Sequence, residues 1–315
     1  EESVMTVPSF VRPTDVSDLY MERSQIVSSE AHAWAKSSRV RPSSADTKKV
    51  AVFGIDVQVA FCTPGASLFV PGAVEDNTRA LAFLYTNLDR ITTLAFSLDT
   101  HRVFQIFHPS WWVDANGANP APLTPVSYAD VKAGKWRATR FSSESEEYVR
   151  LLEQGGKYTL TIWPYHGMLG GLSHALVPAM MELSMFHAIA RDTQTVFVQK
   201  GEEPLTESYS ALSPEVSKIG DRSLGGFDER LFELLMTHDE VYVFGQAKSH
   251  CVLSTLRDLM TKIESTDRSL ASKVVIVGDA MSPVPALNFP ELAQRGIQDL
   301  VENGMRLTDT HARLG

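Results

Sequence analysis

Short apolar runs alternate with amphipathic stretches along most of the chain. The apolar runs are bounded by polar residues, a pattern typical of strands that are buried on both faces of a parallel sheet. They lie at residues 49–58, 91–99, 195–201, 241–247 and 273–280. After the first run, apolar residues recur at helical spacing, as at Ala80, Leu81, Leu84 and Leu88. A strand, a helix and a second strand therefore follow one another in this part of the chain.

The same alternation continues toward the C-terminal end. Further helices are expected at 171–193, 227–240, 250–265 and 288–304, in addition to the one at 74–91. Strands that alternate with helices predict a mostly parallel sheet, covered by helices on both faces and joined by right-handed crossovers. The expected fold class is therefore three-layer α/β.

Two segments depart from this alternation. Residues 1–48 contain prolines, scattered charges and polar sequence, and we expect an N-terminal arm whose middle, about 14–36, is helical. Residues 109–157 show no sustained periodicity, and loops of this length inside a domain are usually lids, binding loops or oligomer contacts. The expected organisation is one domain at 49–315 that carries an insertion at about 109–157.

Composition limits the classes of function. The chain has 315 residues, 43% hydrophobic and 21% charged, as in ordinary soluble globular proteins. Its formal net charge of −9 repels polyanions, so neither nucleic acid nor an anionic membrane is an expected partner. Two cysteines, Cys62 and Cys251, suit a reducing compartment. Without a long apolar stretch or a secretory signal pattern, we expect a cytoplasmic protein, while a targeting segment upstream of Glu1 stays open.

Polar residues with catalytic potential stand at the carboxyl ends of the predicted strands, the edge of a parallel sheet where ligands bind. They are Asp56, Asp99 with His101, Lys200, and the segment from Gln246 to Cys251. Each has an ordinary structural alternative, because an aspartate can cap a turn, a lysine can be a solvated loop charge and a cysteine can be a packing residue. Their coincidence at separate strand ends favours a shared site.

The side chains of Asp56, Lys200 and Cys251 suit nucleophilic catalysis. A cysteine at a helix N-terminus beside an ammonium group favours the thiolate, which attacks carbonyl carbons. A carboxylate can accept the thiol proton and pass it to a departing amine. Backbone N–H groups in the turn 245–251 can hold the developing oxyanion. The predicted reaction is acyl transfer from an amide to water through a thioester.

A candidate metal site lies among the same strand ends. Asp99 and His101 are two residues apart, so on an extended segment their side chains point the same way. His108 follows, and His166 stands in the proline-containing turn 163–167. Imidazoles with one carboxylate suit zinc, iron or manganese and leave positions for water or substrate. Because loop histidines are common and mostly bind nothing, spacing alone leaves this metal site open.

The order of these motifs resembles that of the nicotinamidases, a branch of the isochorismatase-like cysteine hydrolases. The shared pieces are Asp56-Val57-Gln58 with Phe61-Cys62, Gly65-Ala66-Ser67-Leu68, Asp99-Thr100-His101, Trp163-Pro164-Tyr165-His166, Lys200-Gly201 with Tyr209-Ser210, and Gly245 through Cys251. Each piece is short, but the set covers about residues 49–305 apart from the inserts. The resemblance implies an isochorismatase-like fold with Rossmann-like topology.

It also implies roles for the catalytic residues. The base, the cationic partner and the nucleophile are matched by Asp56, Lys200 and Cys251. The oxyanion hole is matched by the N–H groups of Ala247 and Cys251. In such enzymes a cis peptide bond falls where this chain has Gln246-Ala247.

A metal and an aromatic substrate are implied in the same way. The ligands of a divalent transition metal, with zinc as the first candidate and iron or manganese as alternatives, are matched by Asp99, His101 and His166. His108 is a further candidate ligand. The aromatic residues on either side of the substrate ring are matched by Phe61 and Trp163.

The function implied is hydrolysis of nicotinamide to nicotinate and ammonia, within NAD metabolism, by a homo-oligomer acting on a small-molecule amide. Val59-Ala60 stand where nicotinamidases often carry polar or acidic residues, and the arm and the insertion exceed the needs of compact members. A changed pocket wall can alter the substrate while the mechanism is retained. Two alternatives stay open: hydrolysis of another small amide or ureide by the same mechanism, and a non-catalytic relative that serves binding or assembly.

Overall fold

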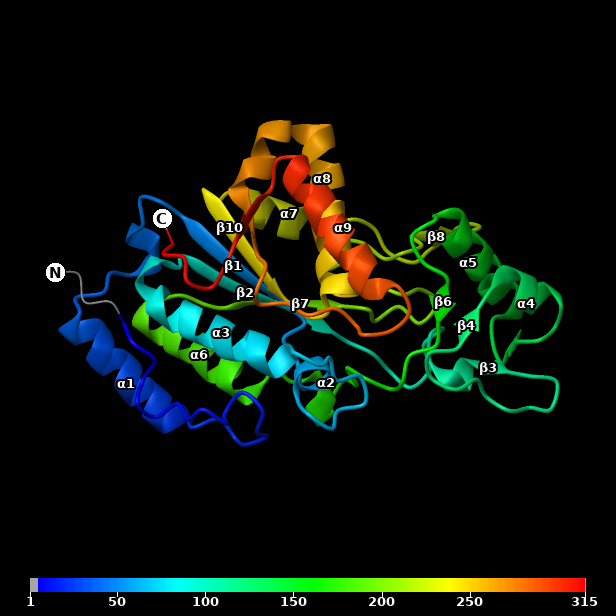
Figure 1. Ribbon diagram of the computed structural model, residues 1–315, viewed down its shortest axis with the longest axis horizontal. Coiled ribbons are helices and arrows are strands. Elements are labelled where there is room, and N and C mark those ends of the chain that lie inside the picture. The colour runs from blue at the N-terminus through cyan, green and yellow to red at the C-terminus, as the bar shows by residue number, and fades with distance from the viewer. Residues whose placement is uncertain (1–4, 315) are drawn as a thin grey trace.

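The computed structural model describes residues 5–314, and a six-stranded parallel sheet forms its centre (Figure 1). The strands lie in the order β12-β11-β10-β1-β2-β7, and all neighbouring pairs are parallel. Their bounds are β1 Val50–Ile55, β2 Thr93–Asp99, β7 Val196–Lys200, β10 Glu240–Gly245, β11 Val274–Val277 and β12 Arg306–Thr308. The predicted parallel sheet is confirmed.

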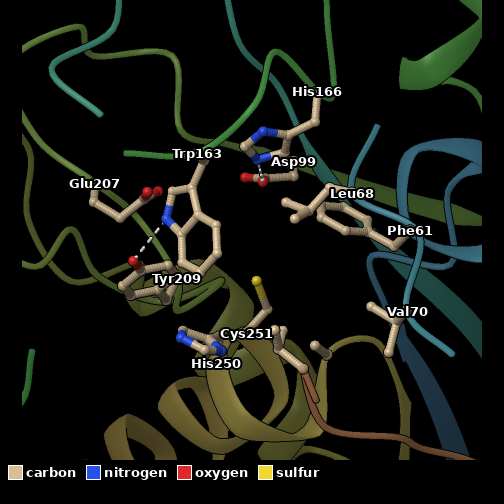
Figure 2. Close-up of a pocket in the computed structure, with 12 residues that line it drawn as sticks. Phe61, Leu68, Val70, Asp99, Trp163, His166, Glu207, Tyr209, His250 and Cys251 are labelled. Atoms are coloured by element: carbon tan, nitrogen blue, oxygen red, sulfur yellow. Dashed lines mark hydrogen bonds and ion pairs between the residues drawn. The ribbon is translucent and has the colours of Figure 1, made fainter. Parts of the chain in front are cut away.

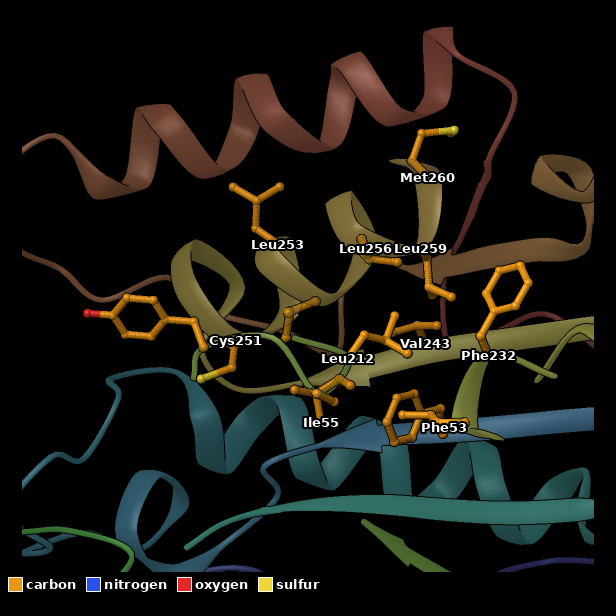
Figure 3. Close-up of a cluster of buried hydrophobic side chains, with 14 of the residues drawn as sticks. Phe53, Ile55, Leu212, Phe232, Val243, Cys251, Leu253, Leu256, Leu259 and Met260 are labelled. Atoms are coloured by element: carbon orange, nitrogen blue, oxygen red, sulfur yellow. The ribbon is translucent and has the colours of Figure 1, made fainter. Parts of the chain in front are cut away.

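Helices cover both faces of this sheet (Figure 1), which confirms the predicted three-layer α/β class. One face carries α3 Ala73–Thr86 and α6 Pro178–Ala190, and the other carries α7 Glu229–Met236, α8 Leu253–Thr266 and α9 Phe289–Glu302. Successive residues of a strand point to opposite faces. Phe53 and Ile55 of β1 therefore join the core beneath α8 (Figure 3), whereas Val50 and Val52 join the core beneath α3 and α6.

The N-terminal arm packs on the α3 and α6 face. Helix α1, Ser24–Ser37, lies against α6. Arg23, directly before α1, donates hydrogen bonds to the buried carboxylates of Asp15 and of Glu182 on α6. The expected helical start near residue 14 is wrong. Asp15 accepts the backbone N–H of Arg12, and such side-chain bonds compete with the helical pattern.

Residues 109–157 leave the sheet between β2 and β7, and their buried side chains join the same hydrophobic cluster as Phe53 and Ile55. Their elements are β3 Trp112–Val113, β4 Pro125–Val126, α4 Tyr128–Lys132, β5 Arg137–Ala138 and α5 Ser142–Gln154. Trp111 is fully buried and donates its indole N–H to Ser145 of α5. β4 pairs with β6, Leu160–Thr161, which leads back toward the sheet. The insertion is therefore a packed part of the fold.

Several short elements complete the described chain. They are the helix α2 Val59–Cys62, the strands β8 Lys218–Ile219 and β9 Arg222–Ser223, a π-helical turn at Lys248–Val252, and 3-10 turns at Ser43–Ala45, Leu88–Arg90, Pro109–Trp111, Leu172–His174 and Arg268–Lys273. The helix expected at 171–193 is shorter than predicted. It begins at Pro178, a residue suited to a first helical turn because it has no N–H. Across residues 5–314, no helix combines the length and the apolar character that a bilayer span needs.

Candidate active site

The carboxyl ends of four neighbouring strands bring the predicted catalytic residues to one edge of the sheet. Asp56 follows β1, and Cys251 lies in the π-helical turn after β10. Asp99 and Lys200 end β2 and β7 and are register partners in the sheet. This edge is where ligands bind in open parallel sheets, so residues far apart in sequence share one potential site.

The Lys200 ammonium group is the centre of this cluster. Its Nζ lies 2.9 Å from Asp56 Oδ2 and 2.8 Å from Asp99 Oδ1, and it is 3.7 Å from Cys251 Sγ. Burial disfavours the charge of this lysine, but the two carboxylates outweigh that effect and raise the pKa of Lys200 well above its ordinary value. Lys200 is therefore a fixed positive charge beside the thiol.

Asp56 is placed to exchange a proton with Cys251. Ser97 donates its hydroxyl to Asp56 Oδ1 at 2.5 Å, whereas Oδ2 lies near Lys200 without the geometry of a hydrogen bond. Cys251 Sγ and Asp56 Oδ2 both lie next to Lys200 Nζ, and each group affects the pKa of the other. Complete burial raises the pKa of Asp56, and Lys200 opposes that shift. A raised pKa strengthens a carboxylate as a base.

The Cys251 thiol is 6% exposed and faces a cavity (Figure 2). Burial raises the pKa of Cys251 well above its ordinary value, although Lys200 acts in the opposite direction. The resting thiol therefore keeps its proton. Lys200 favours the thiolate, as expected from the sequence, but burial outweighs its effect on the pKa of Cys251. Activation then requires a proton acceptor, and the Asp56 carboxyl group lies beside the same Lys200 ammonium group as the thiol.

The backbone of the turn before Cys251 is held by hydrogen bonds to neighbouring segments. The Gln246-Ala247 peptide bond is cis, at the position where the sequence resemblance placed one. Gln246 donates its N–H to Ile55 O at the end of β1, and His250 donates its N–H to Ala247 O. Ala247 and Cys251 both line the cavity. The N–H groups assigned to an oxyanion hole thus belong to residues of the cavity wall.

Asp99, His101 and His166 form a buried group that could hold a metal ion. One potential ligand atom of each lies within 4.8 Å of those of the others. Asp99 Oδ2 is 2.8 Å from His101 Nε2 and 3.4 Å from His166 Nε2. The Nδ1 atoms of the two rings bond the carbonyls of Gly201 and Pro164, which directs the Nε2 lone pairs toward Asp99. Two imidazole nitrogens facing a carboxylate suit a divalent transition metal.

His108 lies beside this group but is not part of it. Its ring centroid is 5.9 Å from that of His101 and 5.8 Å from that of His166. The His108 Nδ1 bonds Val103 O, and Nε2 is buried without a hydrogen-bond partner. Burial lowers the pKa of His108 to about 3, so the ring is neutral. Its role as a metal ligand stays a prediction.

A small cavity that is partly open to solvent lies between Cys251 and the candidate metal group (Figure 2). Its lining residues are Phe61, Leu68, Val70, Asp99, Trp163, His166, Glu207, Tyr209, Ala247, His250, Cys251 and Val284. Trp163 donates its indole N–H to Tyr209 Oη at 2.9 Å, which fixes the plane of this wall. Mostly apolar walls with a few convergent polar groups are typical of small-molecule sites. Both predicted ring-binding residues, Phe61 and Trp163, line this cavity.

Two polar residues of the cavity were not predicted from the sequence. Glu207 is 3% exposed, and burial together with the Asp99 charge raises its pKa to about 8. His250, for which no catalytic role was predicted, lines the cavity and stacks on Tyr158 with 5.5 Å between ring centroids. Burial lowers the pKa of His250 to about 3. His250 is therefore neutral and Glu207 is mostly protonated near neutral pH, whereas Asp99 on the same cavity wall is ionised.

The fold is shared with solved nicotinamidases, although no protein-family model and no curated protein matches this sequence. A nicotinamidase from Acinetobacter baumanii aligns over 84% of this chain and 98% of its own, with 18% identity and a TM-score of 0.55. The yeast nicotinamidase bound to the inhibitor nicotinaldehyde aligns over 82% of this chain and 99% of its own, with 17% identity and a TM-score of 0.56. At such identities the comparison establishes the common fold, and the activity must be argued from the site.

Proposed function

We propose that this protein is a cysteine amidohydrolase assisted by a divalent metal, and that nicotinamide is its substrate. The carrying observation is that the Cys251 thiol, which lines the cavity, lies beside the buried Lys200 ammonium group, and that Lys200 also pairs with the buried Asp56 carboxyl group. The fold shared with two nicotinamidases supports the choice of substrate. On this basis we assign the chain to the nicotinamidase branch of the isochorismatase-like hydrolases.

In the acylation step, Asp56 takes the proton of the Cys251 thiol, and the sulfur forms a bond to the amide carbonyl carbon. The carbonyl π electrons move to oxygen, where the N–H groups of Ala247 and Cys251 donate hydrogen bonds. Lys200 stabilises the anionic charge as the proton leaves the sulfur. When the tetrahedral intermediate collapses, the carbon–nitrogen bond breaks, and protonated Asp56 gives its proton to the departing nitrogen. The products are ammonia and a thioester on Cys251.

Deacylation reverses the roles of the same groups. Asp56 takes a proton from water, and the resulting hydroxide attacks the thioester carbon while the same N–H groups hold the oxyanion. The carbon–sulfur bond then breaks, and the Cys251 sulfur regains its proton from Asp56. One amide and one water have become one carboxylic acid and one ammonia, without an external oxidant or reductant.

The metal would be held by Asp99, His101 and His166. When bound, it would supply a Lewis-acidic position that accepts a ring nitrogen of the substrate and so orients the amide. The imidazole donors favour zinc, with iron or manganese as alternatives. The stacking contacts of the ring are assigned to Phe61 and Trp163 on the cavity wall. Val59 and Ala60, the unusual residues of the sequence, are buried in α2 and do not line this cavity.

The proposal is tested by ammonia release from nicotinamide, with Cys251→Ala as the control. Release by the metal-loaded wild-type protein and none by the variant supports nicotinamide hydrolysis. Release only from other small amides or ureides keeps the mechanism and rejects the substrate. No turnover of any amide by the loaded protein rejects the proposal in favour of a binding or assembly role.

A further inference from the structure

We propose that Asp76 is a positioning residue for the reaction, acting through the side chain of Gln246 to orient the Ala247 N–H group. The inference rests on the proposed function, because it assigns that N–H to the oxyanion hole. Asp76 lies in the first turn of α3, outside the cavity. It therefore influences the reacting atoms only through its neighbour.

Gln246 is fixed at three points. It is fully buried, its backbone N–H donates to Ile55 O at 2.9 Å, and its side-chain Nε2 donates to Asp76 Oδ2 at 2.9 Å. Its Oε1 accepts the N–H of Ser282 at 3.3 Å. The Ala247 N–H belongs to the planar peptide group that begins at the Gln246 carbonyl carbon. A rotation of the Gln246 backbone therefore changes the direction of the Ala247 N–H group, and Ala247 lines the cavity.

Asp76 is itself held on its other side. Its exposed fraction is 3%, and its Oδ1 accepts a hydrogen bond from Arg79 at 2.7 Å. Arg79 also donates to Asp279 O, in the segment that leads to Ser282. A buried carboxylate and a buried amide are costly unless they are hydrogen-bonded. The Asp76 carboxylate and the Gln246 amide are both hydrogen-bonded. Their bonds connect the turn before Cys251 to α3 and to residues 279–282.

The expected kinetic signature follows from what an oxyanion donor does. Its hydrogen bond strengthens in the transition state, so a misplaced donor lowers kcat and leaves KM nearly unchanged. Complete loss of such a donor costs about 100-fold to 1,000-fold in kcat. A donor that is only misoriented should cost less, about 10-fold to 100-fold.

The test exchanges the two partners of the hydrogen bond. Gln246→Glu sets two carboxylates against each other, and we expect a kcat loss of about 10-fold to 100-fold with KM within about 2-fold of wild type. In the double variant Asp76→Asn, Gln246→Glu, the new amide at position 76 can donate to the new carboxylate at position 246. The total charge is that of the wild type. We expect kcat to return to within about 3-fold of the wild-type value.

A matched control separates positioning from stability. Asn87→Leu removes another buried amide at the other end of α3, which bonds Phe83 O, so it should lower the unfolding temperature without changing kcat. Each variant is assayed with nicotinamide and with para-nitrophenyl acetate, an activated ester that acylates a thiol without needing an aromatic amide site. An unchanged kcat in Gln246→Glu, or a double variant that regains stability but not kcat, overturns the role of Asp76.

The two substrates also distinguish this inference from the proposed function. Ester acylation of Cys251 that falls in Gln246→Glu and recovers in the double variant supports the role of Asp76 even if nicotinamide is not hydrolysed. A wild-type protein that releases neither ammonia nor nitrophenolate overturns the proposed function and, with it, this role.

Discussion

One carboxylate oxygen of Asp99 lies 2.8 Å from Lys200 Nζ, and the other lies 2.8 Å from His101 Nε2. The charges of His101 and Lys200 outweigh burial and hold the pKa of Asp99 well below its ordinary value. A single carboxylate thus connects the candidate metal group to the ammonium group beside the nucleophile. Loss of the Asp99 charge should therefore weaken metal binding and also change the position of the Lys200 ammonium group beside Cys251.

This connection predicts different outcomes for two substitutions. Asp99→Asn should lower the amount of bound metal, because it removes the carboxylate ligand. It should also lower the rate of Cys251 acylation by para-nitrophenyl acetate by about 10-fold or more, because Lys200 loses one of its two carboxylate partners. His101→Ala should lower bound metal but keep ester acylation within about 3-fold of wild type, since Lys200 keeps both partners. Metal content by mass spectrometry and the ester assay check the pair, and equal acylation rates in the two variants would argue against the connection.

The N-terminal arm predicts a stability effect without a catalytic one. Arg23 lies 2.6 Å from Asp15 and 2.7 Å from Glu182, whose side chains are 0% and 1% exposed. Arg23→Met leaves the buried Glu182 carboxylate without its cation and leaves Asp15 with only Arg12, so the free energy of unfolding should fall by about 3 kcal/mol. Urea unfolding measures this loss, and ammonia release at low temperature should be retained because the arm lies outside the cavity.

Arg12 provides the matched control for this prediction. It also pairs with Asp15, at 2.8 Å, but its side chain is 59% exposed, and exposed ion pairs contribute less than about 1 kcal/mol. Arg12→Ala should therefore change the unfolding free energy far less than Arg23→Met. Equal losses in the two variants would contradict the importance of the buried contacts.

Glu215 predicts a pH dependence of stability. Burial, opposed by Lys157 and reinforced by Asp258, raises the pKa of Glu215 from 4.5 to about 7. Between these pH values the folded protein keeps a proton that the unfolded chain has released. The free energy of unfolding therefore falls as pH rises through this window, by about 3 kcal/mol at about 1.4 kcal/mol per pH unit.

Glu215→Gln removes this titration and should flatten the profile. Relative to the wild type, the variant should gain stability steadily as pH rises from about 4.5 to about 7, and the difference should be constant above that range. Urea unfolding at several pH values measures the difference. A stability difference that does not vary with pH would show that Glu215 titrates in the folded protein as it does in the unfolded chain.

The sequence predicted five of the six strands of the main sheet, without the short β12, and most of the candidate site, because these depend on strong local signals. Strands buried on both faces are continuous apolar runs, and Asp56 and Lys200 stand where two of those runs end. Parallel strands bring such ends together, so the proximity of these two side chains follows from topology. The fold class required no knowledge of side-chain packing.

Features that depend on tertiary packing could not be predicted from the sequence. Glu207 is one of three glutamates in a short irregular segment with Glu202 and Glu203, and only the fold buries it against the cavity. Trp111 and Tyr148 of the insertion join the same hydrophobic cluster as Phe53 of β1, a contact between segments that are far apart in sequence. The protonated resting thiol likewise follows from the burial of Cys251 rather than from its position near a helix.

The most direct test of this account is the chemical state of Cys251 during turnover. Wild-type protein loaded with metal is mixed with excess nicotinamide, quenched in acid, digested and analysed by mass spectrometry. The account predicts a nicotinoyl group on the peptide that contains Cys251, and none in Cys251→Ala. Sustained ammonia release with Cys251 unmodified at every quench time, and retained by Cys251→Ala, would contradict it.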